Sequence, residues 1–125
     1  MLDITFCSAG ILGIKKPIEV RLRTIPKGNK TEKTLAGWCT YKTRKDKIIS
    51  YVITINIPVC VVSGYSVNDV IAHEIVHAAQ FEYGIFDDNK HHDIKFQNLC
   101  AVLEMELRKL GFEVGELYNP KTDTD

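Results

Sequence analysis

The first half of the chain contains three short segments in which apolar and polar positions alternate. In residues 17–24, PIEVRLRT, aliphatic residues alternate with charged ones, which predicts a strand with one buried face. A second strand is predicted over 34–43, TLAGWCTYKT, where Gly37 marks a bulge or a close approach of another backbone. The third and clearest strand is predicted over 48–58, IISYVITINIP, and is expected to end at its proline.

The connections between these segments have the composition of turns and loops. Residues 25–33, IPKGNKTEK, are polar and contain a proline and a glycine, so they predict an exposed loop. The sequence RKDK at 44–47 turns the chain between the second and third strands. These two strands therefore form a predicted hairpin whose tip is basic.

After residue 65 the apolar positions recur every three or four residues, which is the period of a helix. Ser66 and Asp69 have the spacing of a capping box, and Gly84 is a good C-terminal stop, so a helix is predicted over 67–83. A second helix is predicted over about 92–110. Its apolar stripe consists of Phe96, Leu99, Leu103, Leu107 and Leu110.

Because strands come first and helices follow, the fold class is predicted to be α+β. Two main helices are expected to pack on a small, three-stranded, mostly antiparallel sheet. The 125 residues suffice for one domain with one modest core, placed at about 17–110, and the polar segment 112–125 is expected to be a flexible tail. The composition, 45% hydrophobic and 26% charged, is that of an ordinary soluble protein and offers no membrane partner.

Two further features bear on the compartment. The N-terminus lacks a basic region before its apolar stretch, so the sequence predicts no signal peptide. The four cysteines are scattered without a C-x-x-C pair, and are expected to be small buried side chains in a reducing compartment. The sequence therefore predicts a protein that is not secreted and is cytoplasmic, or nuclear or nucleoid-associated if it works on DNA.

The sequence HEIVH lies within the first predicted helix. His73 and His77 are four residues apart, so they lie about 40° apart around the axis and one turn apart along it, and both can reach one metal ion. Glu74 is offset by about 100°, where it is poorly placed as a ligand but can reach a water on the metal. The alternative is that the three residues form an ordinary polar helix face.

Two histidines need a third donor to hold a catalytic metal. The candidates are His91, His92, Asp93 and Glu106. His92 is favoured because it comes four residues before Phe96 and so begins the apolar stripe, which must pack on the same core as the first helix. His91 is the rival just before the helix. Asp93 points about 100° away, and Glu106 lies about 20 Å further along the axis.

At this point the chain resembles the SprT-like (Spartan-type) zinc metalloproteases. HEIVH, fourteen residues, and then HDIKF match that family in order, in spacing and in the aromatic residue four positions after the last histidine. The segments AGWCTY and ITINIP also resemble the family, so that the resemblance covers about 17–110. One departure is Asp93 where the family commonly has glycine, although Asp is itself favoured in a first helical turn.

The resemblance implies a minimal zincin-like domain with one Zn²⁺ per chain. The implied zinc ligands are His73, His77 and His92. It implies Glu74 as the catalytic acid, which fits a mechanism in which zinc polarises the scissile carbonyl and acidifies water while Glu74 transfers the proton. The residues that would stabilise the oxyanion stay open among Tyr51, Tyr83 and His91. The peptide is expected to add as an extended strand to an open sheet edge.

The resemblance further implies proteolysis of proteins bound or crosslinked to DNA, and the charge distribution fits this. The net charge is zero, yet residues 15–47 carry eleven Lys or Arg against three acids. Such polarity can steer a polyanion to one face. The candidate nucleic-acid contacts are Arg21, Arg23, Trp38, Lys42, Arg44, Lys45 and Lys47, with the tryptophan available to stack on bases. Basic side chains on a small sheet also serve to block edge-to-edge pairing.

Two other functions stay open. The first is a zinc peptidase that acts on a specific regulatory protein and has no nucleic-acid role. The second is a non-catalytic, zinc-stabilised module that binds DNA or protein. The presence of Glu74 argues against the second, because a purely structural zinc site does not need that carboxylate.

Overall fold

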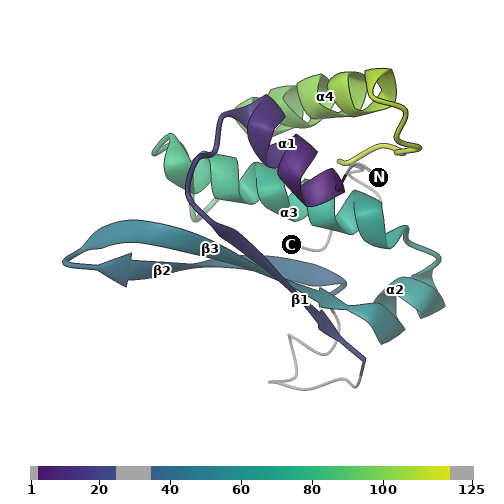
Figure 1. Ribbon diagram of the computed structural model, residues 1–125, viewed down its shortest axis with the longest axis horizontal. Coiled ribbons are helices and arrows are strands. Elements are labelled where there is room, and N and C mark those ends of the chain that lie inside the picture. Colours follow the sequence, from purple (N-terminus) through teal and green to yellow (C-terminus); the bar gives the residue numbers. More distant parts are fainter. Residues whose placement is uncertain (1–2, 25–34, 119–125) are drawn as a thin grey trace.

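The computed structural model describes residues 3–24 and 35–118, and within them it shows one three-stranded sheet and four helices (Figure 1). The α+β class is as predicted. The strands are β1 (Ile18–Arg23), β2 (Gly37–Arg44) and β3 (Lys47–Asn56). The helices are α1 (Ile4–Leu12), α2 (Ile57–Ser63), α3 (Val67–Glu82) and α4 (Ile94–Lys109). The loop expected at 25–33 and the chain beyond Tyr118 lie outside the described residues.

The sheet has the order β1-β3-β2. β2 and β3 form the predicted antiparallel hairpin, and its two-residue turn places Lys45 and Asp46 at φ 52° and 63°, as tight hairpin turns require. β1, however, pairs with β3 in parallel, from Ile18 opposite Tyr51 to Arg23 opposite Asn56. The expectation of a mostly antiparallel sheet is therefore wrong. Alternation along a strand tells which side chains share a face, but not the direction of the neighbouring strand.

One face of the sheet is covered by helices. Tyr51, Ile53 and Ile55 of β3 lie fully buried on the face that the alternation predicted. Ile49 near the hairpin tip and Leu22 near the end of β1 belong to the same predicted apolar faces, yet they are 45% and 58% exposed. The helices therefore cover the middle of the sheet and leave its ends open.

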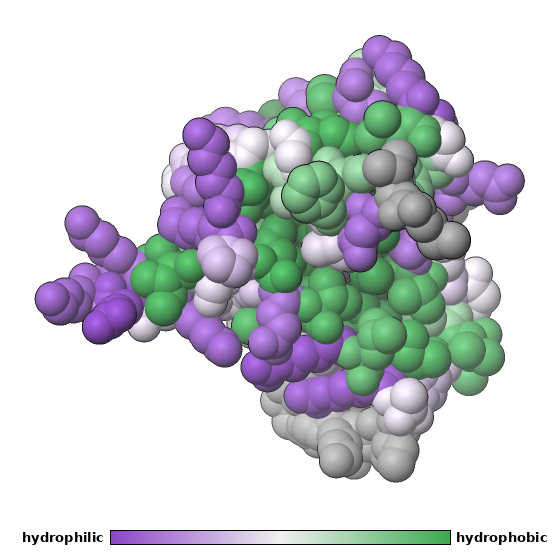
Figure 2. Space-filling model, viewed as in Figure 1, coloured by the Kyte–Doolittle hydropathy of each residue, from purple (hydrophilic) through white to green (hydrophobic). Residues whose placement is uncertain are grey.

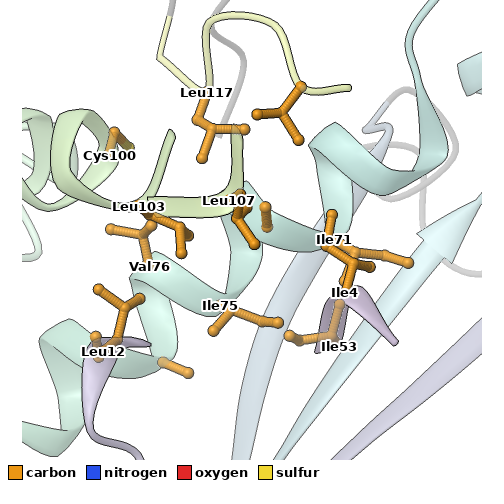
Figure 3. Packing of buried hydrophobic residues seen from close by; sticks show 14 of the residues in the cluster. Ile4, Leu12, Ile53, Ile71, Ile75, Val76, Cys100, Leu103, Leu107 and Leu117 are labelled. Carbon is orange, nitrogen blue, oxygen red and sulfur yellow. The ribbon is translucent and has the colours of Figure 1, made fainter. Parts of the chain in front are cut away.

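α3 lies between the sheet and α4, and α1 crosses both helices (Figure 1). Figure 3 shows side chains of all these layers meeting around α3, with Ile53 from the sheet, Leu12 from α1, and Leu103 and Leu107 from α4. As a result, residues 74–80 of α3 are buried without interruption. A helix in this position can carry polar side chains only if the surrounding structure provides partners for them.

Both ends of α3 agree with the sequence analysis. The Ser66 side chain accepts a hydrogen bond from the Asp69 main-chain N–H at 3.4 Å. The helix stops just before Gly84, which has a φ of 66°. In a complete capping box, the side chain of the second residue accepts a hydrogen bond from the main-chain N–H of the first. Here the Asp69 carboxylate accepts from the main-chain N–H of Gly115 instead.

α1 was not anticipated, although its ends carry capping signals. The Asp3 carboxylate accepts a hydrogen bond from the Thr5 N–H at 2.7 Å, and Gly13 closes the helix with a φ of 74°. Ile4 and Leu12 of this helix are buried in the core. The amphipathic signal was weak because only a narrow face of the nine residues is buried.

α2 was also missed. β3 ends at Asn56, two residues before the proline that was expected to end it, and Pro58 lies in the first turn of α2. Proline is favoured there because the first N–H groups of a helix have no partner within it. No helix among the described residues is long and apolar enough to cross a membrane.

The segment 112–118 corrects the expected flexible tail for the part of it that the structure describes. Val114 and Leu117 are buried, and the Leu117 N–H donates to the Glu104 carboxylate of α4 at 2.5 Å. The Gly115 N–H donates to Asp69 of α3 at 3.1 Å. The segment looked frayed in sequence because the spacing of its apolar residues (Phe112, Val114, Leu117 and Tyr118) follows no helical or strand period, whereas its partners are carboxylates far away in the chain.

The close approach predicted at Gly37 exists and gives a test of the packing between β2 and α3. A Cβ on Gly37 would lie 2.8 Å from Val70 Cγ1 and 3.1 Å from the Thr54 main-chain oxygen. We expect Gly37→Ala to lower the free energy of unfolding by about 1–3 kcal/mol through overpacking. The control is Gly10→Ala in α1, where nothing lies within 4 Å, so that stability should stay equal or rise by up to about 1 kcal/mol. Urea denaturation measures both, and an equal effect of the two substitutions would contradict the tight packing.

Candidate metal centre

Three histidines converge on one point beside α3. His73 and His77 lie one turn apart on that helix, with ring centroids 5.1 Å apart. His92, from the loop before α4, brings its Nε2 to 3.1 Å from Nε2 of His77. One ligand nitrogen from each of the three rings lies within 4.8 Å of the others. The structure thus brings together the three histidines that the sequence analysis chose.

These distances fit a metal ion. Two donors bound to one tetrahedral ion at roughly 2.0–2.1 Å lie about 3.3 Å apart. The observed 3.1 Å between the Nε2 atoms of His77 and His92 is close to that spacing. His77 and His92 are thus at the spacing of two metal ligands, and a ligand nitrogen of His73 lies within 4.8 Å of both, so the three side chains could hold a metal ion.

The Nδ1 atoms of the two helical histidines face oxygens. His73 Nδ1 lies 2.5 Å from the main-chain carbonyl oxygen of Leu117, and His77 Nδ1 lies 2.7 Å from Gln80 Oε1. These oxygens can only accept, so each Nδ1 carries the proton and each Nε2 keeps its lone pair. Metal-binding histidines are commonly oriented by such contacts.

Phe96 forms the floor of the site. Its ring is fully buried, and its centroid lies 4.5 Å from that of His92, 4.6 Å from that of His77 and 5.1 Å from that of His73. An apolar floor restricts the rotamers of the three imidazoles and keeps water away from one side. This residue was recognised in the sequence as part of the apolar stripe, but its contact with all three histidines was not foreseen.

Glu74 is the only acid in the buried central part of α3, with 1% of its surface exposed. The helix places it next to His73 in sequence and about 100° further around the axis. Burying a carboxylate is costly, so its position here singles it out as a candidate for chemistry at the metal.

His92 reaches the site by a route different from the one expected. It was placed within the helix at the top of the apolar stripe, but α4 begins only at Ile94. Asp93 is the N-cap residue, and its carboxylate accepts from the Phe96 N–H at 3.0 Å. The position of His92 is therefore set by the capping turn, in which Asp93 stands where SprT-like proteins commonly have glycine.

The other candidates for the third ligand have different contacts. The His91 ring stacks on Phe86, with centroids 5.0 Å apart, and is exposed. The Glu106 carboxylate pairs with Lys109 at 3.2 Å. Neither they nor Asp93 belong to the three-histidine group.

Two of the three candidates for oxyanion stabilisation bond elsewhere. The Tyr51 hydroxyl donates to the Glu82 carboxylate at 2.6 Å, and the Tyr83 hydroxyl donates to the Leu12 carbonyl oxygen. Lys16 also donates to Glu82, and together Lys16 and Tyr51 hold the pKa of the Glu82 carboxyl below its ordinary value. These contacts join β3, α1 and the end of α3, so they serve the fold. Tyr118, which the sequence analysis did not consider, places its ring 5.6 Å from that of His92.

The proposed nucleic-acid contacts fall into two groups. Four basic side chains are exposed around the hairpin tip, which forms the hydrophilic projection on the left of Figure 2: Lys42, Arg44, Lys45 and Lys47. The others contact neighbouring side chains on the sheet: the Arg23 guanidinium lies 5.1 Å above the Trp38 ring, and Arg21 pairs with Glu19. Trp38 therefore already has a cation against its ring.

The strand register places this second group on the far side of the sheet from the metal centre. Arg21 and Trp38 both lie opposite Thr54, so all three share one face. Ile53 and Ile55 point to the other face, toward α3. The hairpin tip, in contrast, extends past the helices (Figure 1).

The fold and the site define an α+β protein with a three-histidine group that can bind a metal ion. The family model described as the SprT-like family matches residues 15–115. The chain therefore belongs to the SprT-like family, as the sequence resemblance indicated. Searches of curated proteins and of solved structures find no match.

Two neighbouring histidines allow a matched test of the ligand set. We expect the wild-type protein to bind one zinc ion per chain and His92→Ala to retain little of it, because two histidines alone hold zinc weakly. His91→Ala removes an exposed ring outside the group and should keep a full complement. Elemental analysis after incubation with zinc and gel filtration measures both. Full zinc in His92→Ala, or loss only in His91→Ala, would contradict the assignment.

Proposed function

We propose that this protein is a zinc-dependent endopeptidase with a minimal zincin-like architecture. The observation that carries the proposal is the convergence of His73, His77 and His92 beside a buried glutamate that directly follows the first of them. Three protein ligands are typical of catalytic zinc sites, since structural sites use four. Membership of the SprT-like family supports the same activity.

The residues of the metal centre would each have a separate role in peptide hydrolysis. The three histidines would hold the zinc, which when bound supplies Lewis-acid chemistry to polarise a carbonyl and acidify water. Glu74 would accept a proton from the attacking water and deliver it to the amine nitrogen as the peptide C–N bond breaks. Phe96 beneath the imidazoles would keep the ligands in place and exclude water from that side.

The substrate would bind along β2. Among the described residues β2 pairs only with β3, so its other edge can pair with an extended peptide. β2 runs next to the helix that carries the ligands, because the Tyr41 ring lies 4.9 Å from that of Phe81 in α3 and Gly37 packs on Val70. Main-chain pairing needs little side-chain specificity, which suits an endopeptidase with many substrates.

The role of Glu74 can be tested without removing the metal. Glu74→Gln keeps the shape of the side chain but cannot accept the proton, so we expect normal zinc content and a loss of cleavage of about 10²–10⁴-fold. An unfolded protein such as denatured casein is the substrate, and a gel-based assay with a chelator-treated sample gives the background. Cleavage that survives in Glu74→Gln at the wild-type rate would exclude this mechanism. Absence of cleavage in the zinc-loaded wild type under all conditions would favour the non-catalytic module.

We further propose that the substrates are proteins bound or crosslinked to DNA. Four basic side chains at the hairpin tip support this, because they are exposed and lie beyond the cover of the helices. The tip continues β2, so DNA bound there would lie near the peptide-binding edge. The alternative, a peptidase of one regulatory protein, requires no such contact.

The DNA contact is tested by charge reversal at the tip. We expect Lys42→Glu with Arg44→Glu to weaken DNA binding about tenfold or more and to reduce the slope of log K against log salt by about 2. Lys95→Glu with Lys109→Glu makes the same change in net charge on exposed positions of α4 and should have a much smaller effect. Fluorescence anisotropy at several salt concentrations measures both. Equal effects of the two pairs would exclude the hairpin tip as the contact.

A further inference from the structure

We propose that Gln80 positions the metal centre by fixing the tautomer of His77 and tying that ring to the loop that carries His92. The inference rests on the metal-binding part of the proposed function and adds a residue outside the HEIVH sequence. Gln80 lies three residues after His77 on α3 and is completely buried. A buried amide has to satisfy both of its ends, and this one does so with two contacts at the centre.

Both contacts are short. Gln80 Oε1 lies 2.7 Å from Nδ1 of His77, and the Gln80 amide N–H donates to the main-chain carbonyl oxygen of His91 at 2.8 Å. The side chain thus bridges the second ligand on α3 and the residue that directly precedes the third ligand.

The chemistry of the partners fixes the direction of each bond. The His91 carbonyl oxygen can only accept, so the amide nitrogen of Gln80 must face it. Oε1 is then left toward His77, and because it also can only accept, His77 Nδ1 must carry the proton. A neutral imidazole has one proton, so Nε2 keeps its lone pair, and Nε2 is the atom that faces His92. The main chain at His91 therefore determines the tautomer of His77 before any metal binds.

A second glutamine makes a similar contact without touching a ligand ring. The Gln97 amide N–H donates to the main-chain carbonyl oxygen of His92 at 3.0 Å. Gln80 and Gln97 thus hold two successive carbonyl groups of the same loop. Gln97 is the matched control, because its replacement loosens the loop but leaves the partner of His77 in place.

Three variants separate tautomer control from support of the loop. Gln80→Met has a similar volume and loses both contacts, whereas Gln97→Met loses only a loop contact. Gln80→Glu keeps an acceptor for His77 Nδ1 but cannot donate to the His91 carbonyl oxygen when ionised. Two properties of each variant are measured: zinc affinity by competition with a chromophoric chelator, and the protonated nitrogen of His77 in the metal-free protein by long-range ¹H–¹⁵N NMR near pH 8.5, where ordinary imidazoles are neutral.

We expect wild type, Gln97→Met and Gln80→Glu to show the proton on Nδ1 of His77. Gln80→Met should show a mixture of tautomers and a loss of zinc affinity of about 10–100-fold, the usual effect of removing a partner that orients a ligand. Gln97→Met should lose clearly less affinity than Gln80→Met. The inference is overturned if the His77 tautomer is unchanged in Gln80→Met, or if the two methionine variants lose equal affinity.

If Gln80→Met does not fold, Gln80→Glu decides. An Nδ1 proton on His77 together with a zinc affinity clearly below that of wild type supports the inference, because this variant keeps the acceptor for Nδ1 and loses the tie to the loop. The other tautomer, or an affinity equal to that of wild type, overturns it. The tautomer is measured in the metal-free protein, so its outcome is separate from that of the proposed function. The predicted tautomer can be absent from a protein that binds zinc and cleaves peptides. It can also be present in a wild-type protein that never cleaves a peptide.

Discussion

The burial of residues 74–80 of α3 on all sides is the constraint on which the rest of the structure depends. The sheet, α1 and α4 all pack against this one helix, so its polar side chains sit where an unpartnered group is costly. Each helical histidine accordingly directs Nδ1 to an oxygen acceptor, and Gln80 has a partner at both ends of its amide. With their Nδ1 atoms occupied in this way, the two rings present Nε2 to the third histidine and to a metal ion. Dense packing thus decides which nitrogen is available for chemistry.

The site is assembled from three parts of the chain that contribute in different ways. α3 supplies two rings at helical spacing and the buried glutamate. The N-terminal end of α4 supplies His92 and Phe96, whose rings are in contact, and the Asp93 carboxylate between them caps the helix through the Phe96 N–H. The segment 112–118 supplies a main-chain oxygen to His73 and the Tyr118 ring beside His92, and it is tied to both helices by the carboxylates of Asp69 and Glu104. A short C-terminal segment is therefore part of the metal centre.

The basic side chains proposed to contact DNA and the metal centre lie in different regions of the molecule. Arg21, Arg23 and Trp38 lie on the outer face of the sheet and are engaged with neighbouring side chains, whereas the metal centre lies on the helical side. The hairpin tip projects past the helices at one end of the sheet, and its four basic residues are exposed (Figure 2). A polyanion at the tip and a peptide along β2 would lie on one continuous element. The sheet would thus support α3 and also connect the proposed DNA-binding tip with the proposed peptide-binding edge.

The sequence by itself determined the local features. The hairpin, the capped helix predicted over 67–83 and the placement of His73, Glu74 and His77 on it follow from periods of two and 3.6 residues and from capping residues, all of which act within a few positions. The sequence also identified His92, although it placed this residue within the helix that carries the apolar stripe, whereas α4 begins at Ile94. Tertiary structure alone decided the parallel pairing of β1, the packing of 112–118 and the partners of the histidine Nδ1 atoms. These depend on contacts between distant segments, and several involve main-chain carbonyl and N–H groups, which every residue carries and which therefore leave no trace in the sequence.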